Sequence, residues 1–133
     1  YILNLSNNLI HSYQIYGDLV DLVLEVDKVL LNLDQAIPCG LIVNELFSNA
    51  LKYAFEPNKK GSITISLTHN HKDEIKLIIK DNGKGLPDNF DFRKTESLGL
   101  QLVTTLVEQI DGTVNCETKK EKGTSFIIEF KKL

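Results

Sequence analysis

Five short runs of alternating apolar and polar residues constrain the fold of this chain more than any other feature of its sequence. Ile63, Ile65 and Leu67 alternate with Ser and Thr, as in a strand that buries one face and exposes the other. Short polar turns join four of the runs in pairs, which predicts two β-hairpins. The predicted strands span residues 19–27, 62–68, 75–80, 113–119 and 124–132.

Apolar residues at spacings of three and four predict helices between these strands. The predicted helices span residues 1–12, about 35–55 and 99 to about 110. We expect Asp34 to cap the second helix with Pro38 in its first turn, and Asp111-Gly112 to end the third. Because hairpins dominate, we predict a two-layer α/β (α+β) sandwich, in which a mixed, mostly antiparallel sheet carries its helices on one face.

The composition is that of one soluble globular domain, which we expect to span residues 1–133. The net charge of -3 comes from interspersed charges, which argues against binding to nucleic acid or anionic lipid. Cys39 and Cys116 are too few for a disulfide framework or a metal quartet, and both are expected in the core. The chain starts at Tyr1, lacks Met and has no transmembrane-length apolar run, so we expect a cytoplasmic fragment of a longer, free or membrane-anchored protein.

The polar face of the helix predicted at 35–55 has an unusual composition. Glu45, Asn49 and Lys52 fall within roughly 60° of each other, which fits a solvated face but also a magnesium triphosphate site. Asn lowers helix propensity, so its presence in mid-helix favours the second interpretation. The Asn49 amide oxygen suits Mg²⁺, Lys52 could neutralise phosphate charge, and Glu45 could act as a base. The expected apolar face contains Val43, Leu46, Phe47, Ala50 and Ala54.

Asp81 follows an apolar strand and begins the sequence Asp-Asn-Gly-Lys-Gly. We interpret the polar segment at residues 81–98 as a long functional loop or as a segment with a turn or two of irregular helix. An ordinary turn explains these residues. Alternatively, the Asp81 carboxylate accepts a hydrogen bond from the amino group of adenine and repels the carbonyl of guanine. Gly83 and Gly85 would then let the base lie against the backbone.

A second loop enters a helix at Ser97-Leu98-Gly99-Leu100. The free N–H groups at a helix N-terminus bind phosphate, and Gly99 would allow close approach. A simple N-cap by Ser97 explains the same residues equally well. The last candidate segment is Gly-Thr-Ser-Phe at residues 123–126, which taken alone indicates a turn and a strand.

Together these four segments resemble the GHKL, or Bergerat, nucleotide-binding fold shared by DNA gyrase, the Hsp90 chaperones, histidine kinases and mismatch-repair ATPases. Residues 44–55 resemble its N box, 81–85 its G1 box, 97–100 its G2 box and 123–126 its Gly-Thr-x-Phe motif. Residues 35–41, the short lid and the sequence Ser-Leu-Gly-Leu-Gln-Leu-Val are similar to short-lid sensor histidine kinases related to the HWE kinases.

The resemblance implies ATP and Mg²⁺ as ligands, with transfer of the γ-phosphoryl group to a histidine on a helical dimerisation domain and then to a response regulator. It implies Asn49 as the metal ligand, Glu45 and Lys52 as catalytic residues, and Phe90 or Phe92 as a lid aromatic. The implied nucleotide contacts are Asn49, Lys52, Tyr53, Asp81, Gly83, Gly85, Leu86, Ser97, Leu98, Gly99, Leu100 and Thr124.

Departures from the family pattern leave alternatives open. The chain lacks Trp, so it is not an HWE kinase proper, and Ser97 replaces the first glycine of many G2 boxes. His11, His69 and His71 lack the dimerisation-helix context, so we expect the phospho-acceptor domain upstream of this fragment. A protein-serine kinase of the anti-sigma-factor type and an ATP-driven clamp are the alternatives to a histidine kinase.

Overall fold

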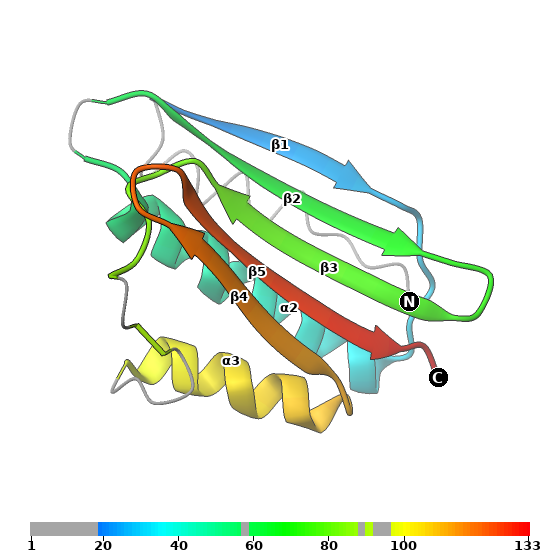
Figure 1. Cartoon of the computed structure of the whole chain (residues 1–133). Helices are drawn as coiled ribbons and strands as arrows, with labels where there is room; N and C mark the ends of the chain where they lie inside the picture. The colour runs from blue at the N-terminus through cyan, green and yellow to red at the C-terminus, as the bar shows by residue number, and fades with distance from the viewer. Residues whose placement is uncertain (1–18, 57–58, 88–89, 92–96) are drawn as a thin grey trace.

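The computed structural model describes residues 19–56, 59–87, 90–91 and 97–133, and shows one sheet with two helices on one of its faces (Figure 1). The helix predicted at residues 1–12 lies outside the described residues. In the described part of the chain, no helix is both long and apolar enough to span a membrane. The elements in chain order are β1 (Val20–Val26), α2 (Leu33–Asn49), the π-helix η1 (Ala50–Ala54), β2 (Gly61–His69), β3 (Glu74–Asp81), α3 (Leu98–Gln109), β4 (Thr113–Lys119) and β5 (Gly123–Lys131).

The sheet has five strands in the order β1-β2-β3-β5-β4. β1 runs parallel to β2, and the other neighbouring pairs are antiparallel. The two predicted hairpins, β2–β3 and β4–β5, are confirmed, and they join through pairing of β3 with β5. The mixed, mostly antiparallel two-layer sandwich predicted from the sequence is therefore confirmed.

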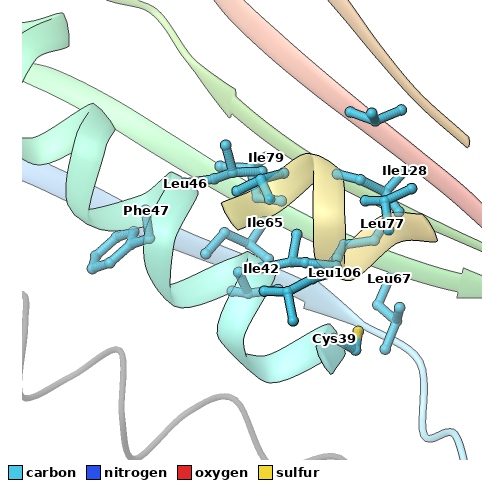
Figure 2. Close-up of a cluster of buried hydrophobic side chains, with 14 of the residues drawn as sticks. Cys39, Ile42, Leu46, Phe47, Ile65, Leu67, Leu77, Ile79, Leu106 and Ile128 are labelled. Carbon is cyan, nitrogen blue, oxygen red and sulfur yellow. The ribbon is translucent and has the colours of Figure 1, made fainter. Parts of the chain in front are cut away.

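The core lies between the sheet and the two helices, as Figure 2 shows. Ile65, Leu67 and Leu77 of the sheet are fully buried against Ile42 of α2 and Leu106 of α3. Fully burying one such side chain contributes about 1.5–3 kcal/mol, so the alternating pattern supplies most of the driving force for docking the helices. On α2 the expected apolar face is also buried, apart from a half-buried Ala54.

The two cysteines differ in their environment. Cys39 is completely buried on α2, and this burial raises the pKa of its thiol to about 12. Cys116 on β4 is partly buried and packs against the edge of the core. Cys39 has the expected core position, whereas Cys116 lies only at the edge of the core, and no disulfide joins the two.

The predicted start of α2 is wrong by two residues. Asn32, not Asp34, is the N-cap, and its Oδ1 accepts a hydrogen bond from the Gln35 N–H at 3.3 Å. Asp34 instead lies in the first turn, where its negative charge interacts favourably with the positive end of the helix dipole. Pro38 consequently falls inside the helix rather than in its first turn.

The end of α2 also differs from the prediction, whereas α3 ends at Asp111-Gly112 as predicted. The chain beyond Asn49 forms a π-helical turn, Ala50–Ala54, instead of a continued α-helix, and Phe55 is extended. After α3, Asp111 rather than Gly112 adopts the left-handed conformation, with φ of 53°. Asp tolerates this region better than most residues because its short polar side chain can bond locally.

Gln35 is a buried polar residue that the sequence pattern did not single out. It is 2% exposed, and its side chain hydrogen bonds to the backbone at the end of the chain. Its Nε2 donates to the Lys131 carbonyl at 2.8 Å, and its Oε1 accepts from the Leu133 N–H at 3.1 Å. The first turn of α2 is thereby tied to the end of β5.

Candidate functional site

A cavity of about 900 Å³ opens between the C-terminal part of α2, the π-helical turn, the end of β3, and the starts of β5 and α3. This volume is typical of sites for small organic ligands. Apolar side chains make up much of the wall, and a few polar groups converge on it. The described lining residues are Leu46, Asn49, Ala50, Tyr53, Ala54, Ile79, Asp81, Lys84, Gly85, Leu86, Pro87, Phe90, Ser97, Leu100, Lys120, Glu121, Thr124 and Phe126.

Asp81 is the buried carboxylate of this cavity. The period-two alternation of β3 that buries Ile75, Leu77 and Ile79 continues to Asp81, which therefore faces the helices. Asp81 is 8% exposed and pairs across the sheet with Thr124 of β5. A charged side chain thus occupies the position that the strand pattern would give to a further core residue.

The Asp81 carboxyl is held by backbone donors. Its Oδ1 accepts hydrogen bonds from the Gly83 N–H at 2.9 Å and from the Thr124 N–H at 3.3 Å. Burial raises the pKa of Asp81, and these two N–H donors act in the opposite direction without cancelling the effect. Since both bonds from described residues end on Oδ1, Oδ2 is the oxygen that can accept a bond from a ligand in the cavity.

The first part of the glycine loop packs against the π-helical turn. A Cβ on Gly83 would overlap the carbonyl of Ala54, so only glycine fits there without a backbone shift. The next residue, Lys84, donates its N–H to that same carbonyl at 2.8 Å. The last residue of the π-helical turn therefore contacts the glycine loop, and this contact fixes the position of the loop relative to the helix that carries Asn49.

The second part of the loop packs against the β4–β5 hairpin. Gly85 has a φ of +76°, and a Cβ there would overlap the carbonyl of Lys119. The Glu121 N–H at the hairpin tip donates to the Lys84 carbonyl at 2.8 Å. This contact brings Lys120 and Glu121 to the cavity wall.

The start of α3 completes the cavity opposite Asn49. Ser97 is its N-cap and accepts a hydrogen bond from the Leu100 N–H at 3.4 Å, as the capping interpretation predicted. A Cβ on Gly99 would overlap the carboxylate of Glu45 and would lie 3.5 Å from Asn49 Nδ2. The polar face of α2 and the first turn of α3 therefore touch at Gly99.

The predicted site residues fall into two groups. Those that line the cavity are Asn49, Tyr53, Asp81, Gly85, Leu86, Ser97, Leu100 and Thr124. Among the others, Glu45 and Gly99 meet where α2 and α3 touch, and Gly83 lies behind the loop against Ala54. Lys52 and Leu98 are exposed and are not among the described lining residues.

Of the two candidate lid aromatics, Phe90 lines the cavity, and Phe92 lies outside the described residues. Sequence analysis did not identify Lys84, Lys120 and Glu121 as wall residues. Lys84 could have been found from its position between the two loop glycines. The hairpin tip gave no such signal, because its approach to the loop is a tertiary contact.

Comparisons with known proteins agree with this geometry. Residues 34–133 match the family described as histidine kinase-, DNA gyrase B- and HSP90-like ATPase. The sensor histidine kinase PdtaS of Mycobacterium tuberculosis is 33% identical over 115 residues, which cover 82% of this chain and 23% of that protein. Sporulation kinase A of Bacillus subtilis is 26% identical over 118 residues, covering 81% of this chain and 19% of that protein. The chain thus spans about a quarter or less of the length of these relatives.

A solved structure with the same fold is the histidine kinase domain of the blue-light-activated histidine kinase EL346 of Erythrobacter litoralis. It superposes with a TM-score of 0.89 at 23% identity, over 96% of this chain and 58% of that one. This likeness shows the fold, in agreement with the strand order and the single helical layer described above.

The close contact at Gly83 leads to a stability prediction with an internal control. Gly83→Ala should lower the unfolding temperature, since its Cβ would overlap the Ala54 carbonyl and force the loop away from the π-helical turn. Gly40→Ala is the control, because nothing lies within 4 Å of a Cβ at Gly40 inside α2. Ala is favoured over Gly in a helix by about 1 kcal/mol, so this variant should be neutral or stabilised. Equal thermal stability of the two variants would contradict the close packing of the loop.

Proposed function

We propose an ATP-binding and phosphoryl-transfer function for this chain, which belongs to the family of histidine kinase-, DNA gyrase B- and HSP90-like ATPases. In this proposal the cavity holds ATP, and the domain supplies the γ-phosphoryl group to a histidine of a separate dimerisation domain. The relative PdtaS, which is named as a sensor histidine kinase, supports this choice within the family.

The observation that carries the proposal is that Asp81 and Asn49 line one cavity. Asp81 Oδ2 would accept a hydrogen bond from the exocyclic amino group of adenine, because Oδ1 already binds two backbone N–H groups. A guanine would present a carbonyl oxygen to the same carboxylate and would be repelled. Leu46, Ile79 and Phe126 offer apolar surface to the purine ring.

The phosphates would lie toward α3, where Asn49 and Glu45 approach Gly99. Backbone N–H groups of the first turn of a helix, together with its dipole, favour phosphate. The exposed Lys52 would neutralise phosphate charge from the solvent side. Leu98 and Leu100 would contribute backbone rather than side-chain contacts there.

The donor set fits a magnesium ion bound chiefly by the nucleotide. Mg²⁺ prefers oxygen ligands and is commonly held by one or two protein groups, phosphate oxygens and water. The amide oxygen of Asn49 would be the protein ligand. When bound, the ion would neutralise phosphate charge and orient the γ-phosphoryl group for in-line transfer.

In the transfer itself, an imidazole nitrogen of the acceptor histidine would form a bond to the γ-phosphorus while the bond to the β–γ bridging oxygen breaks and ADP leaves. Glu45 would orient the imidazole and accept its proton. The dimerisation domain of the same protein and a downstream response regulator are the proposed partners.

The adenine assignment predicts a loss of base selectivity in Asp81→Asn. The asparagine oxygen should stay at the N–H groups of Gly83 and Thr124, which turns the amide NH₂ toward the ligand. A charge-assisted hydrogen bond contributes about 1.5–3 kcal/mol, so ATP affinity should fall by roughly 10- to 150-fold while GTP affinity stays or rises. Calorimetric titration with ATP and GTP measures both. Wild-type protein that binds the two nucleotides equally would rule out the adenine contact.

A pH series provides a control for the adenine assignment. Adenosine replaces ATP in this titration because it has no phosphate group that titrates. Because burial raises the pKa of Asp81, its carboxylate should become protonated at a higher pH than the carboxylate of an ordinary Asp. Adenosine affinity of the wild type should therefore be full above this raised pKa and should fall as the pH decreases through it. Asp81→Asn should lack this dependence in the pH range in which adenine N1 stays unprotonated.

The metal assignment predicts that Asn49→Ala weakens ATP binding in the presence of magnesium and has little effect when the ion is removed by a chelator. One neutral oxygen ligand is replaceable by water, so we expect a loss of about tenfold rather than a complete loss. Asn44→Ala, on an exposed position of the same helix, is the matched control. An equal effect of Asn49→Ala with and without magnesium would exclude Asn49 as the metal ligand.

Phosphotransfer distinguishes a histidine kinase from a serine kinase. The domain is incubated with radiolabelled ATP and helical, His-containing segments of its parent protein, and the label is then tested in acid. We expect acid-labile phosphate on the added segment and none on this chain alone. Acid-stable phosphate on an added protein would favour the serine-kinase alternative, and ATP turnover with no phosphoprotein would favour a clamp.

A further inference from the structure

Thr118 lies next to the cavity but outside its wall, and its hydroxyl is hydrogen bonded to two segments of the site. It follows Val114 and Cys116 on the helix-facing side of β4, where it is exposed at the end of the edge strand. Its cross-strand partner in the register of the sheet is Thr124, which lines the cavity beside Asp81. Facing Thr residues on antiparallel strands commonly bond through their hydroxyls.

Three hydrogen-bonding groups surround the Thr118 hydroxyl. Its Oγ1 accepts from the Leu86 N–H at 2.9 Å, which holds the loop residue that enters the cavity wall. It also lies 2.9 Å from Thr124 Oγ1 and 3.4 Å from the Gly123 carbonyl. Thr118 has one hydroxyl proton, so it can donate to one of the last two groups at a time.

Of the two groups to which the Thr118 hydroxyl can donate, Thr124 Oγ1 is the closer. Hydroxyl hydrogen bonds between oxygens are normally about 2.5–3.0 Å long, so the contact with Thr124 Oγ1 has suitable length and that with the Gly123 carbonyl is long. With Thr118 as the donor, the proton of Thr124 does not point back to Thr118. In that orientation the proton of the Thr124 hydroxyl is available to a group in the cavity, which Thr124 lines.

We propose that Thr118 is a positioning residue for base recognition, which keeps the hydroxyl of Thr124 as a donor toward the purine while anchoring Leu86. This inference rests on the proposed binding of adenine. Asp81 and Thr124 would then present an acceptor and a donor side by side. Adenine has the complementary pair, since its amino group donates and its N1 accepts. Guanine has the reverse pair, a carbonyl acceptor and an N1–H donor.

The experiment couples a side-chain change to a change in the base. ATP and 1-deaza-ATP, which has a C–H in place of N1, are titrated into the 133-residue chain and into Thr118→Val and Thr118→Ser. Val has nearly the same shape as Thr and favours strands, but it lacks the hydroxyl. Thr113→Val, at an exposed position of the same strand, is the control for the loss of a hydroxyl on β4.

Wild-type protein should bind ATP about three- to tenfold more tightly than 1-deaza-ATP, the range expected for one net neutral hydrogen bond. In Thr118→Val this difference should shrink to about twofold or less, and amide hydrogen exchange at Leu86 should accelerate. Thr118→Ser and Thr113→Val should behave like the wild type.

The possible failures are distinct. If Thr118→Val keeps the full difference between the two nucleotides, the inference is overturned, even if both bind more weakly, because that result indicates a structural role. If Thr118→Val does not fold, the difference in affinity between ATP and 1-deaza-ATP is measured for Thr118→Ala instead. Wild-type protein that binds no adenine nucleotide would instead overturn the proposed function itself.

Discussion

The contact of Asp81 Oδ1 with two backbone N–H groups is the interaction on which the rest of the site depends. A buried carboxylate is unfavourable unless hydrogen bonds compensate for its lost hydration. Gly83 and Thr124 provide that compensation, and they belong to the glycine loop and to β5. One side chain at the end of β3 therefore joins the loop that directly follows it to the start of β5, which lies 43 residues further along the chain. Both of these bonds end on the same carboxylate oxygen.

Around this contact, backbone segments approach each other more closely than side chains would allow. The loop after β3 lies between the carbonyl of Ala54 on one side and that of Lys119 on the other. Each approach is accompanied by a backbone hydrogen bond of 2.8 Å that involves Lys84. Main-chain packing thus determines the shape of the cavity wall beside Asp81.

The sequence predicted the strands and their hairpins because these depend on local periodicity. Periodicity also placed Asp81 after a strand and Asn49 on the polar face of a helix, but the resemblance to the GHKL fold was needed to predict that both residues line one cavity. The π-helical turn was not predictable, since the same apolar residues fit an α-helix. Lys120, Glu121 and Thr118 were missed because their roles arise where the hairpin tip meets the loop. Gln35 was missed because its partners are backbone groups almost a hundred positions away.

The unequal burial of the two thiols has a practical consequence for spectroscopy. Cys39 is inaccessible and stays protonated across the usual pH range, so a maleimide or iodoacetamide dye should couple to Cys116 in the folded protein. Cys116 is directly opposite Phe126, a cavity-lining residue, in the β4–β5 register. A fluorophore attached there would report occupancy of the cavity in the natural sequence, with no cysteine added or removed.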